Sequence, residues 1–175
     1  MNLPNKITLT RIFLIPICVF LLLINSVTTN IISVLIFVLA CLTDALDGYI
    51  ARKNNLVTDF GKFMDPLVDK LLIISVAIAL VELKKISCWV VILIAWRELI
   101  VTGFRLIAAK KNTVIAANIL GKIKTVLQML MIIIIMLGFQ NNFMHMLKNL
   151  LIVMTAFFTL WSGFDYIYIN RQLLK

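Results

Sequence analysis

The chain contains little of the chemistry that binds soft metals or forms disulfides. It has one His and three Cys among its 175 residues. Cys18, Cys41 and Cys88 lie in apolar stretches and none forms a CxxC pair, so we interpret them as small buried residues rather than as a zinc site or a disulfide framework. His145 stands alone in the sequence, which argues against a role as a metal ligand.

Acidic residues are also scarce. Eight Asp and Glu stand against 17 Lys and Arg, which gives a formal net charge of +9. A basic chain raises the question of nucleic acid binding. Here the Lys and Arg residues are spread between apolar runs instead of forming one polar module, so the charge pattern argues against a nucleic acid partner.

The chain is rich in apolar residues. They make up 62% of the sequence, against about 45–50% in soluble domains. Six apolar segments, each near the length of about 20 residues that crosses a bilayer, are separated by polar breaks. No small-x-small cleavage site follows the first segment, so we interpret it as a retained helix. We predict one all-α integral membrane domain over residues 1–175, with six transmembrane helices near 7–24, 31–52, 58–81, 87–109, 117–138 and 143–169.

The basic residues predict how these helices are oriented. Cytoplasmic ends of transmembrane helices carry an excess of Lys and Arg. If the N-terminus is cytoplasmic, only Lys84, Lys85 and Lys148 fall on the outer side, which leaves 14 of the 17 basic residues inside. An even number of spans returns the C-terminus to the same side, so both termini are predicted to be cytoplasmic.

Four aspartates lie inside the second and third apolar segments. Asp44 and Asp47 are three residues apart, and Asp65 and Asp69 are four apart, so each pair lies on one face of its helix. The two helices are joined by a short polar connection and are expected to pack antiparallel. Both pairs would then lie at a similar depth, about 8–16 Å from the connection.

An ionised Asp within a membrane helix costs about 2.5–3.5 kcal/mol on insertion scales, so something cationic must compensate for four of them. Carboxylates without nearby His or Cys suit Mg²⁺ or Mn²⁺, and four of them suit two ions better than one. Two alternatives stay open on the residues alone: buried ion pairs with nearby Lys and Arg, and a pathway for cations or protons.

The full spacing reads Asp44-x2-Asp47-Gly48-x2-Ala51-Arg52-x8-Gly61-x3-Asp65-x3-Asp69. This pattern resembles the signature of the CDP-alcohol phosphatidyltransferase family, and the six-segment hydropathy pattern extends the resemblance over nearly the whole chain. The resemblance implies a six-helix enzyme, often dimeric, that opens to the cytoplasm. It implies transfer of a phosphatidyl group from CDP-diacylglycerol to an alcohol, with release of CMP.

The resemblance also implies roles for the matching residues. Asp44, Asp47 and Asp65 would hold the metal ions, and Asp69 would be the catalytic general base while also contacting a metal. The CDP-binding residues would be Gly48, Ala51, Arg52 and Gly61. The opening Pro4-Asn5-x2-Thr8-x2-Arg11 adds Asn5 and Thr8 to that site, although these residues could instead cap and anchor the first helix.

The acceptor alcohol must be chosen by residues outside this signature. The stretches Arg97-Glu98 to Arg105 and Gly121 to Thr125 are similar to phosphatidylglycerophosphate synthases, in which the acceptor is glycerol 3-phosphate. By this resemblance the acceptor phosphate would bind cations and a hydroxyl that include Arg97, Thr102, Arg105, Lys122 and Lys124. Lys122 and Lys124 diverge by about 200° on a helix, so one of them is expected to face the phosphate, and Lys122 matches the subfamily better.

The implied partners are CDP-diacylglycerol, glycerol 3-phosphate, the lipid bilayer and a second copy of the chain. The implied location is the cytoplasmic membrane of a bacterial cell, with the active site on the cytoplasmic side. Serine, inositol phosphate or phosphatidylglycerol as the acceptor, and a divalent-cation transporter, remain the alternative interpretations.

Overall fold

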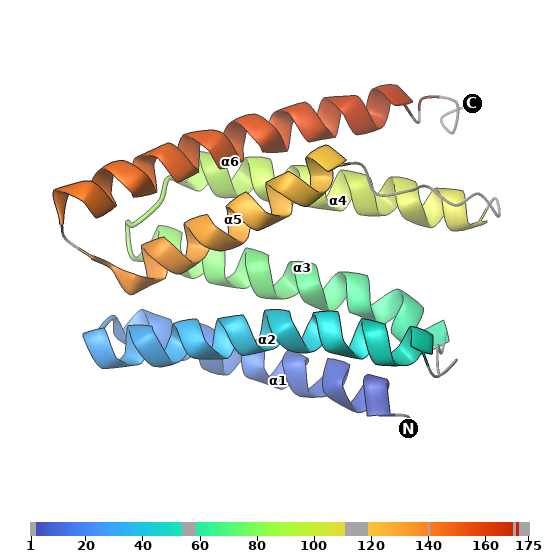
Figure 1. The fold of residues 1–175 in the computed structure, drawn as a ribbon, viewed down its shortest axis with the longest axis horizontal. Helices are drawn as coiled ribbons and strands as arrows, with labels where there is room; N and C mark the ends of the chain where they lie inside the picture. The colour runs from blue at the N-terminus through green and yellow to red at the C-terminus, as the bar shows by residue number, and fades with distance from the viewer. Residues whose placement is uncertain (1–2, 54–58, 111–118, 140, 170, 172–175) are drawn as a thin grey trace. The chain divides into compact units, whose positions relative to one another are not determined.

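The structure, a computed structural model, describes residues 3–53, 59–110, 119–139, 141–169 and 171. Within helices, the side chains of residues 3–6, 44–53, 59–60, 62–63, 106–107 and 109–110 are not described. The described residues form six α-helices in chain order (Figure 1). Their bounds are α1 Leu3–Ile24, α2 Val27–Lys53, α3 Asp59–Glu82, α4 Cys88–Lys110, α5 Ile119–Leu137 and α6 Asn142–Ile169.

The helix ends follow the polar breaks in the sequence. Asn25 ends α1 in a left-handed conformation with φ of 53°, which Asn adopts more readily than other non-glycine residues. Ser26 caps α2, because its hydroxyl accepts a 3.2 Å hydrogen bond from the backbone N–H of Thr29. The expected cap of α3, Thr58, lies outside the described residues. α1 and α2 each begin four residues earlier than expected, at Leu3 rather than Ile7 and at Val27 rather than Ile31.

The chain divides into two compact units. The first contains α1, α2 and α3, together with residues 136–138, and α1 packs against both α2 and α3. Its core contains the fully buried side chains of Cys18, Leu22, Phe37 and Val76. The Ser33 hydroxyl of α2 donates a hydrogen bond to the backbone oxygen of Cys18, so a polar contact also joins α1 to α2.

The second unit contains α4, α5 as far as Ile135, and α6, and α4 packs directly on α6. Ile94, Met131 and Ile132 are buried in its core. One face of α6 is polar although it is buried, with Thr155, Thr159 and Ser162 spaced by four and three residues. Buried hydroxyls need hydrogen-bond partners, so this face is where polar side chains from the neighbouring helices are expected to gather.

Three of the described helices are long and apolar enough to cross a membrane: the 7–24 part of α1, all of α5 and all of α6. A shorter apolar stretch, Val27–Thr43, lies in α2. Large apolar side chains such as Phe13, Phe20 and Trp89 are exposed, which suits a lipid environment. The all-helical fold is therefore confirmed and a membrane protein is plausible, while the number of spans and their orientation stay predictions.

Candidate active site

The signature residues lie on two consecutive helices of the first unit. Asp44, Asp47, Gly48, Ala51 and Arg52 fall within the last ten residues of α2, and Gly61, Asp65 and Asp69 within the first eleven of α3. The side chains from Asp44 to Arg52 are outside the described set, as is that of Asn5. Among the described side chains no three His, Cys, Asp or Glu residues gather, so the four-aspartate cluster stays a prediction.

Asp65 has a partner on the first helix. The Thr8 hydroxyl of α1 donates a hydrogen bond of 2.8 Å to Asp65 Oδ1. Thr8 is 1% exposed and Asp65 is half-buried. A carboxylate has about four lone-pair sites, so the bond to Thr8 fixes the Asp65 rotamer and leaves oxygen sites for a further ligand. The packing of α1 against α3 therefore orients one predicted metal ligand.

Asp69 lies one helical turn after Asp65. Its Oδ2 is 3.9 Å from Lys70 Nζ, at the outer limit of an ion pair, and its side chain is 32% exposed. A carboxylate with this exposure can reach a polar substrate, as the predicted base must. Gly61, two turns before Asp69 on the same helix, is buried. The contact with Lys70, at the outer limit of an ion pair, is weak support for the ion-pair alternative.

The second unit holds a buried ionic cluster. Glu98 of α4 accepts hydrogen bonds from Arg97 Nη1, at 3.2 Å, and from Lys124 Nζ of α5. The Lys124 side chain is 1% exposed, Arg97 10% and Glu98 13%. The contact between Glu98 and Lys124 joins α4 to α5. Breaking it from one side would leave the other charge without this partner in a largely buried place, so the cluster of Arg97, Glu98 and Lys124 is expected to hold the two helices together.

The other predicted acceptor residues lie nearer to solvent. Arg105 on α4 and Lys122 on α5 are exposed, and Thr102 is half-buried with its hydroxyl bonded to the Glu98 backbone oxygen at 2.7 Å. The structure thus brings Arg97 and Lys124 together through Glu98 and does not record a contact of Arg105 or Lys122 with them among the described residues. The expected divergence of Lys122 and Lys124 is observed, with one exposed and one buried.

Arg97 has a further partner, on α6, that was not expected from the sequence. Ser162 of α6 accepts a 3.2 Å hydrogen bond from Arg97 Nε and donates one to the backbone oxygen of Thr159. The partners Arg97 and Ser162 are 65 positions apart, so no local pattern joins them. The signal that sequence reasoning could have used is the spacing of Thr155, Thr159 and Ser162, which places three hydroxyls on one face of an apolar helix.

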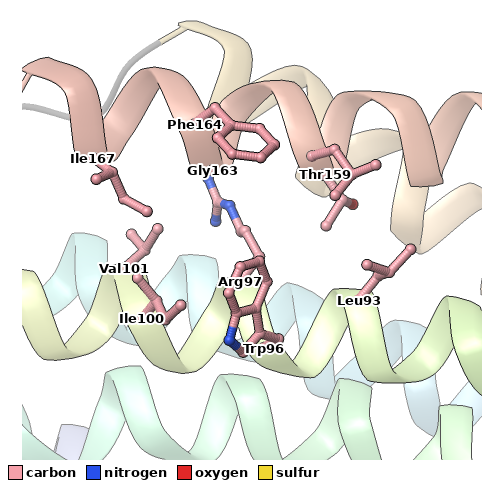
Figure 2. A pocket seen from close by; sticks show the side chains of 10 residues that line it. Leu93, Trp96, Arg97, Ile100, Val101, Thr159, Gly163, Phe164 and Ile167 are labelled. Atoms are coloured by element: carbon pink, nitrogen blue, oxygen red, sulfur yellow. The ribbon is translucent and has the colours of Figure 1, made fainter.

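An open pocket with about 350 Å³ of empty space lies between α4 and α6. Figure 2 shows the Arg97 side chain crossing this region from α4 toward Gly163 of α6. Apart from Arg97 and Thr159 the lining is apolar, and it includes Trp96, Val101 and Ile167. A phosphate would not find enough partners there, so the pocket surrounds the stem of Arg97 rather than forming the anion site.

Comparison with known proteins gives the context for both groups of residues. The CDP-alcohol phosphatidyltransferase family model matches residues 1–161. Relatives named CDP-diacylglycerol–glycerol-3-phosphate 3-phosphatidyltransferase include one from Bacillus subtilis, 41% identical over 99% of this chain and 97% of its own length. One from Rickettsia typhi is 39% identical, over 94% of each chain. One from Wigglesworthia glossinidia brevipalpis is 31% identical, over 92% of this chain and 96% of its own. The chain belongs to the CDP-alcohol phosphatidyltransferase family.

Proposed function

We propose that this chain transfers the phosphatidyl group of CDP-diacylglycerol to glycerol 3-phosphate and releases CMP. The observation that carries the proposal is the occurrence, in one chain, of the family signature from Asp44 to Asp69 and of the ionic cluster of Arg97, Glu98 and Lys124 on α4 and α5. The signature accounts for the nucleotide half of the reaction. The cations account for an acceptor that bears a phosphate. The relatives that cover most of this chain carry the name of this activity.

The aspartates fit a pair of Mg²⁺ or Mn²⁺ ions. Asp65 and Asp69 lie on one face of α3, one Asp65 oxygen is already oriented by Thr8, and hard carboxylate oxygens are the ligands that these cations prefer. Asp44 and Asp47 would complete the set from α2. Such ions, when bound, neutralise the pyrophosphate and the charge that develops on the leaving CMP.

The remaining steps belong to the side chains. Asp69 accepts the proton of the attacking hydroxyl of glycerol 3-phosphate, because its side chain is 32% exposed and can reach a polar substrate. The hydroxyl oxygen then bonds to the phosphorus that carries diacylglycerol, and the bond to CMP breaks. Gly48, Ala51, Arg52 and Gly61 shape the CDP site, with Asn5 beside it. Arg97, Arg105 and Lys122 bind the acceptor phosphate, with Thr102 and Lys124 in support.

We further propose that all six helices cross the cytoplasmic membrane of a bacterial cell, with both termini and the active site on the cytoplasmic side. Lipid tails can then remain in the bilayer while the headgroup enters the polar site. The distribution of the 17 Lys and Arg residues supports this orientation. A second copy of the chain is the proposed protein partner.

Two other functions make different predictions. An enzyme that uses another acceptor, such as serine, inositol phosphate or phosphatidylglycerol, would keep the aspartate site, but its cations on α4 and α5 would not bind glycerol 3-phosphate. A divalent-cation transporter would keep the aspartates and release no CMP. The transporter does not account for the spacing of Gly48, Ala51, Arg52 and Gly61, so we favour the enzyme.

The test is CMP release by the purified chain in detergent with CDP-diacylglycerol and Mg²⁺. Glycerol 3-phosphate, serine, inositol phosphate and phosphatidylglycerol are supplied in parallel, and Asp69→Asn is the control. We expect release with glycerol 3-phosphate alone, and its loss in the variant. Release with a different acceptor would replace the proposed substrate, and metal flux into liposomes without any CMP would favour the transporter.

A further inference from the structure

The Arg97 guanidinium is held at two of its three nitrogens. Nε donates to the Ser162 hydroxyl of α6 and Nη1 donates to the Glu98 carboxylate, each at 3.2 Å. Ser162 is itself held by its bond to the backbone oxygen of Thr159. Two bonds on different sides of a planar group fix both its position and the orientation of its plane. The third nitrogen, Nη2, therefore points in a defined direction.

Two glycines leave room for this side chain. A Cβ atom added to Gly121 of α5 would lie 3.2 Å from Arg97 Nη2, with no other described neighbour within 4 Å beyond its own helix backbone and chain neighbours. A Cβ atom added to Gly163 of α6 would lie 3.3 Å from Arg97 Cγ. Both distances are tighter than ordinary contacts. Gly163 thus admits the stem of Arg97, and Gly121 keeps the space beside Nη2 open.

Nη2 is left without a hydrogen bond in the part of the chain that the structure describes, although Arg97 is 90% covered. A guanidinium carries five N–H donors, and those on Nη2 are the ones that neither Ser162 nor Glu98 takes. A side chain that is already immobilised loses little conformational entropy when it binds an anion. The arrangement is that of an arginine prepared to donate from one end to a phosphate.

We propose that Ser162 and Glu98 are positioning residues that direct Arg97 Nη2 to the phosphate of the acceptor, a phosphomonoester, and that Gly121 keeps this approach open. The inference rests on the proposed function, in which Arg97 binds glycerol 3-phosphate. It adds α6 to the acceptor site through a residue that never contacts the substrate. The competing explanation is that Ser162 only helps α6 to pack on α4.

A matched pair of variants separates these explanations. Ser162→Ala removes the hydroxyl that holds Arg97. Thr155→Val removes a buried hydroxyl from the same face of α6, seven residues earlier, whose oxygen has no partner among the described residues. Both variants lose one buried hydroxyl from the same face of α6, so a role in packing alone predicts that neither of them selectively changes binding of the acceptor. A positioning role predicts that only Ser162→Ala changes binding of the acceptor.

The experiment is steady-state kinetics on the full chain in detergent, with each substrate varied while the other saturates. In Ser162→Ala we expect KM for glycerol 3-phosphate to rise about tenfold, as for a lost hydrogen bond to a charged group, while KM for CDP-diacylglycerol stays within about twofold. Thr155→Val should leave both KM values within about twofold. Ser162→Thr, which keeps the hydroxyl, should restore the KM for glycerol 3-phosphate.

Gly121→Ala is a second, independent test, because it places a methyl group against Nη2 without touching α6. It should raise the same KM and spare that for CDP-diacylglycerol. An unchanged KM for glycerol 3-phosphate in both Ser162→Ala and Gly121→Ala would overturn the inference alone, as would an equal rise in Thr155→Val. A wild-type chain that releases no CMP with glycerol 3-phosphate would overturn the proposed function, and this inference with it.

Discussion

Thr8 on α1 and Asp65 on α3, 57 residues apart, are joined by a hydrogen bond of 2.8 Å from the Thr8 hydroxyl to Asp65 Oδ1. The opening motif of the chain and the third aspartate of the signature are thus one structural unit. The resemblance to the family assigned Thr8 to the CDP site. The geometry gives it a contact with Asp65, a proposed metal ligand.

Thr8→Val should weaken metal binding while keeping the shape of the side chain. Loss of a partner that orients a metal ligand typically costs about 10–100-fold in metal affinity, and Val replaces only the hydroxyl. The measurement is Mn²⁺ binding by electron paramagnetic resonance on the detergent-purified chain, which does not depend on turnover. Thr8→Ser keeps the hydroxyl and should bind Mn²⁺ within about threefold of wild type.

The matched control for this substitution is Thr28→Val, on an exposed position at the start of α2. It makes the same chemical change away from Asp65 and should leave Mn²⁺ affinity unaltered. Equal Mn²⁺ affinity in Thr8→Val and wild type would mean that the bond to Asp65 does not orient a metal ligand. Thr8 would then keep only its assignment to the CDP site.

Arg105→Glu should raise KM for glycerol 3-phosphate by about tenfold or more, because it places a like charge near a phosphate with a charge close to −2. Arg171→Glu makes the same change at another exposed arginine, one that lies 4.8 Å over the Tyr168 ring and outside the proposed site. It should leave that KM within about twofold. Steady-state kinetics with glycerol 3-phosphate varied give KM for both variants. An equal rise in KM in both would mean that Arg105 acts only through the net charge of the surface.

The sequence was sufficient to predict the helices but not the contacts between them. Apolar runs and polar breaks predicted the six helices, and the largest errors in their ends are the four residues by which α1 and α2 each begin earlier than expected. Helical spacing gave the divergence of Lys122 and Lys124. It could not tell which one is buried, because that depends on where Glu98 lies on another helix.

Gly138 and Gly103 lie in different backbone conformations, so replacing each of them with Ala should change the stability of the fold in opposite directions. Gly138 has φ of +65°, a conformation that costs other residues about 1–2 kcal/mol, so Gly138→Ala should destabilise the fold. Gly103 lies inside α4, and beyond its own helix backbone and chain neighbours no described atom lies within 4 Å of its Cβ position, so Gly103→Ala should gain up to about 1 kcal/mol of helix propensity. The midpoint of thermal unfolding in detergent should fall in the first variant and rise in the second. Midpoints that move in the same direction would contradict either the left-handed conformation of Gly138 or the open helical position of Gly103.

The ion pair between Glu98 and Lys124 should be strongly coupled in stability. Glu98→Gln leaves a Lys124 side chain that is 1% exposed without its carboxylate, and breaking a buried pair from one side costs about 3–5 kcal/mol. Lys124→Met should cost less, because Glu98 keeps Arg97 as a partner. The double variant should be more stable than the sum of the two losses predicts, by about 1 kcal/mol or more.

This double-mutant cycle is measured through the free energy of unfolding of each variant in mixed micelles. In a control cycle, Lys122→Met takes the place of Lys124→Met. Lys122 lies two residues away on the same helix and is exposed, so it should show no coupling to Glu98. Strictly additive losses for Glu98 and Lys124 would mean that the two charges are screened from each other. The rigid support that holds α5 against α4, and with it Gly121 beside Arg97, would then have to come from apolar packing instead.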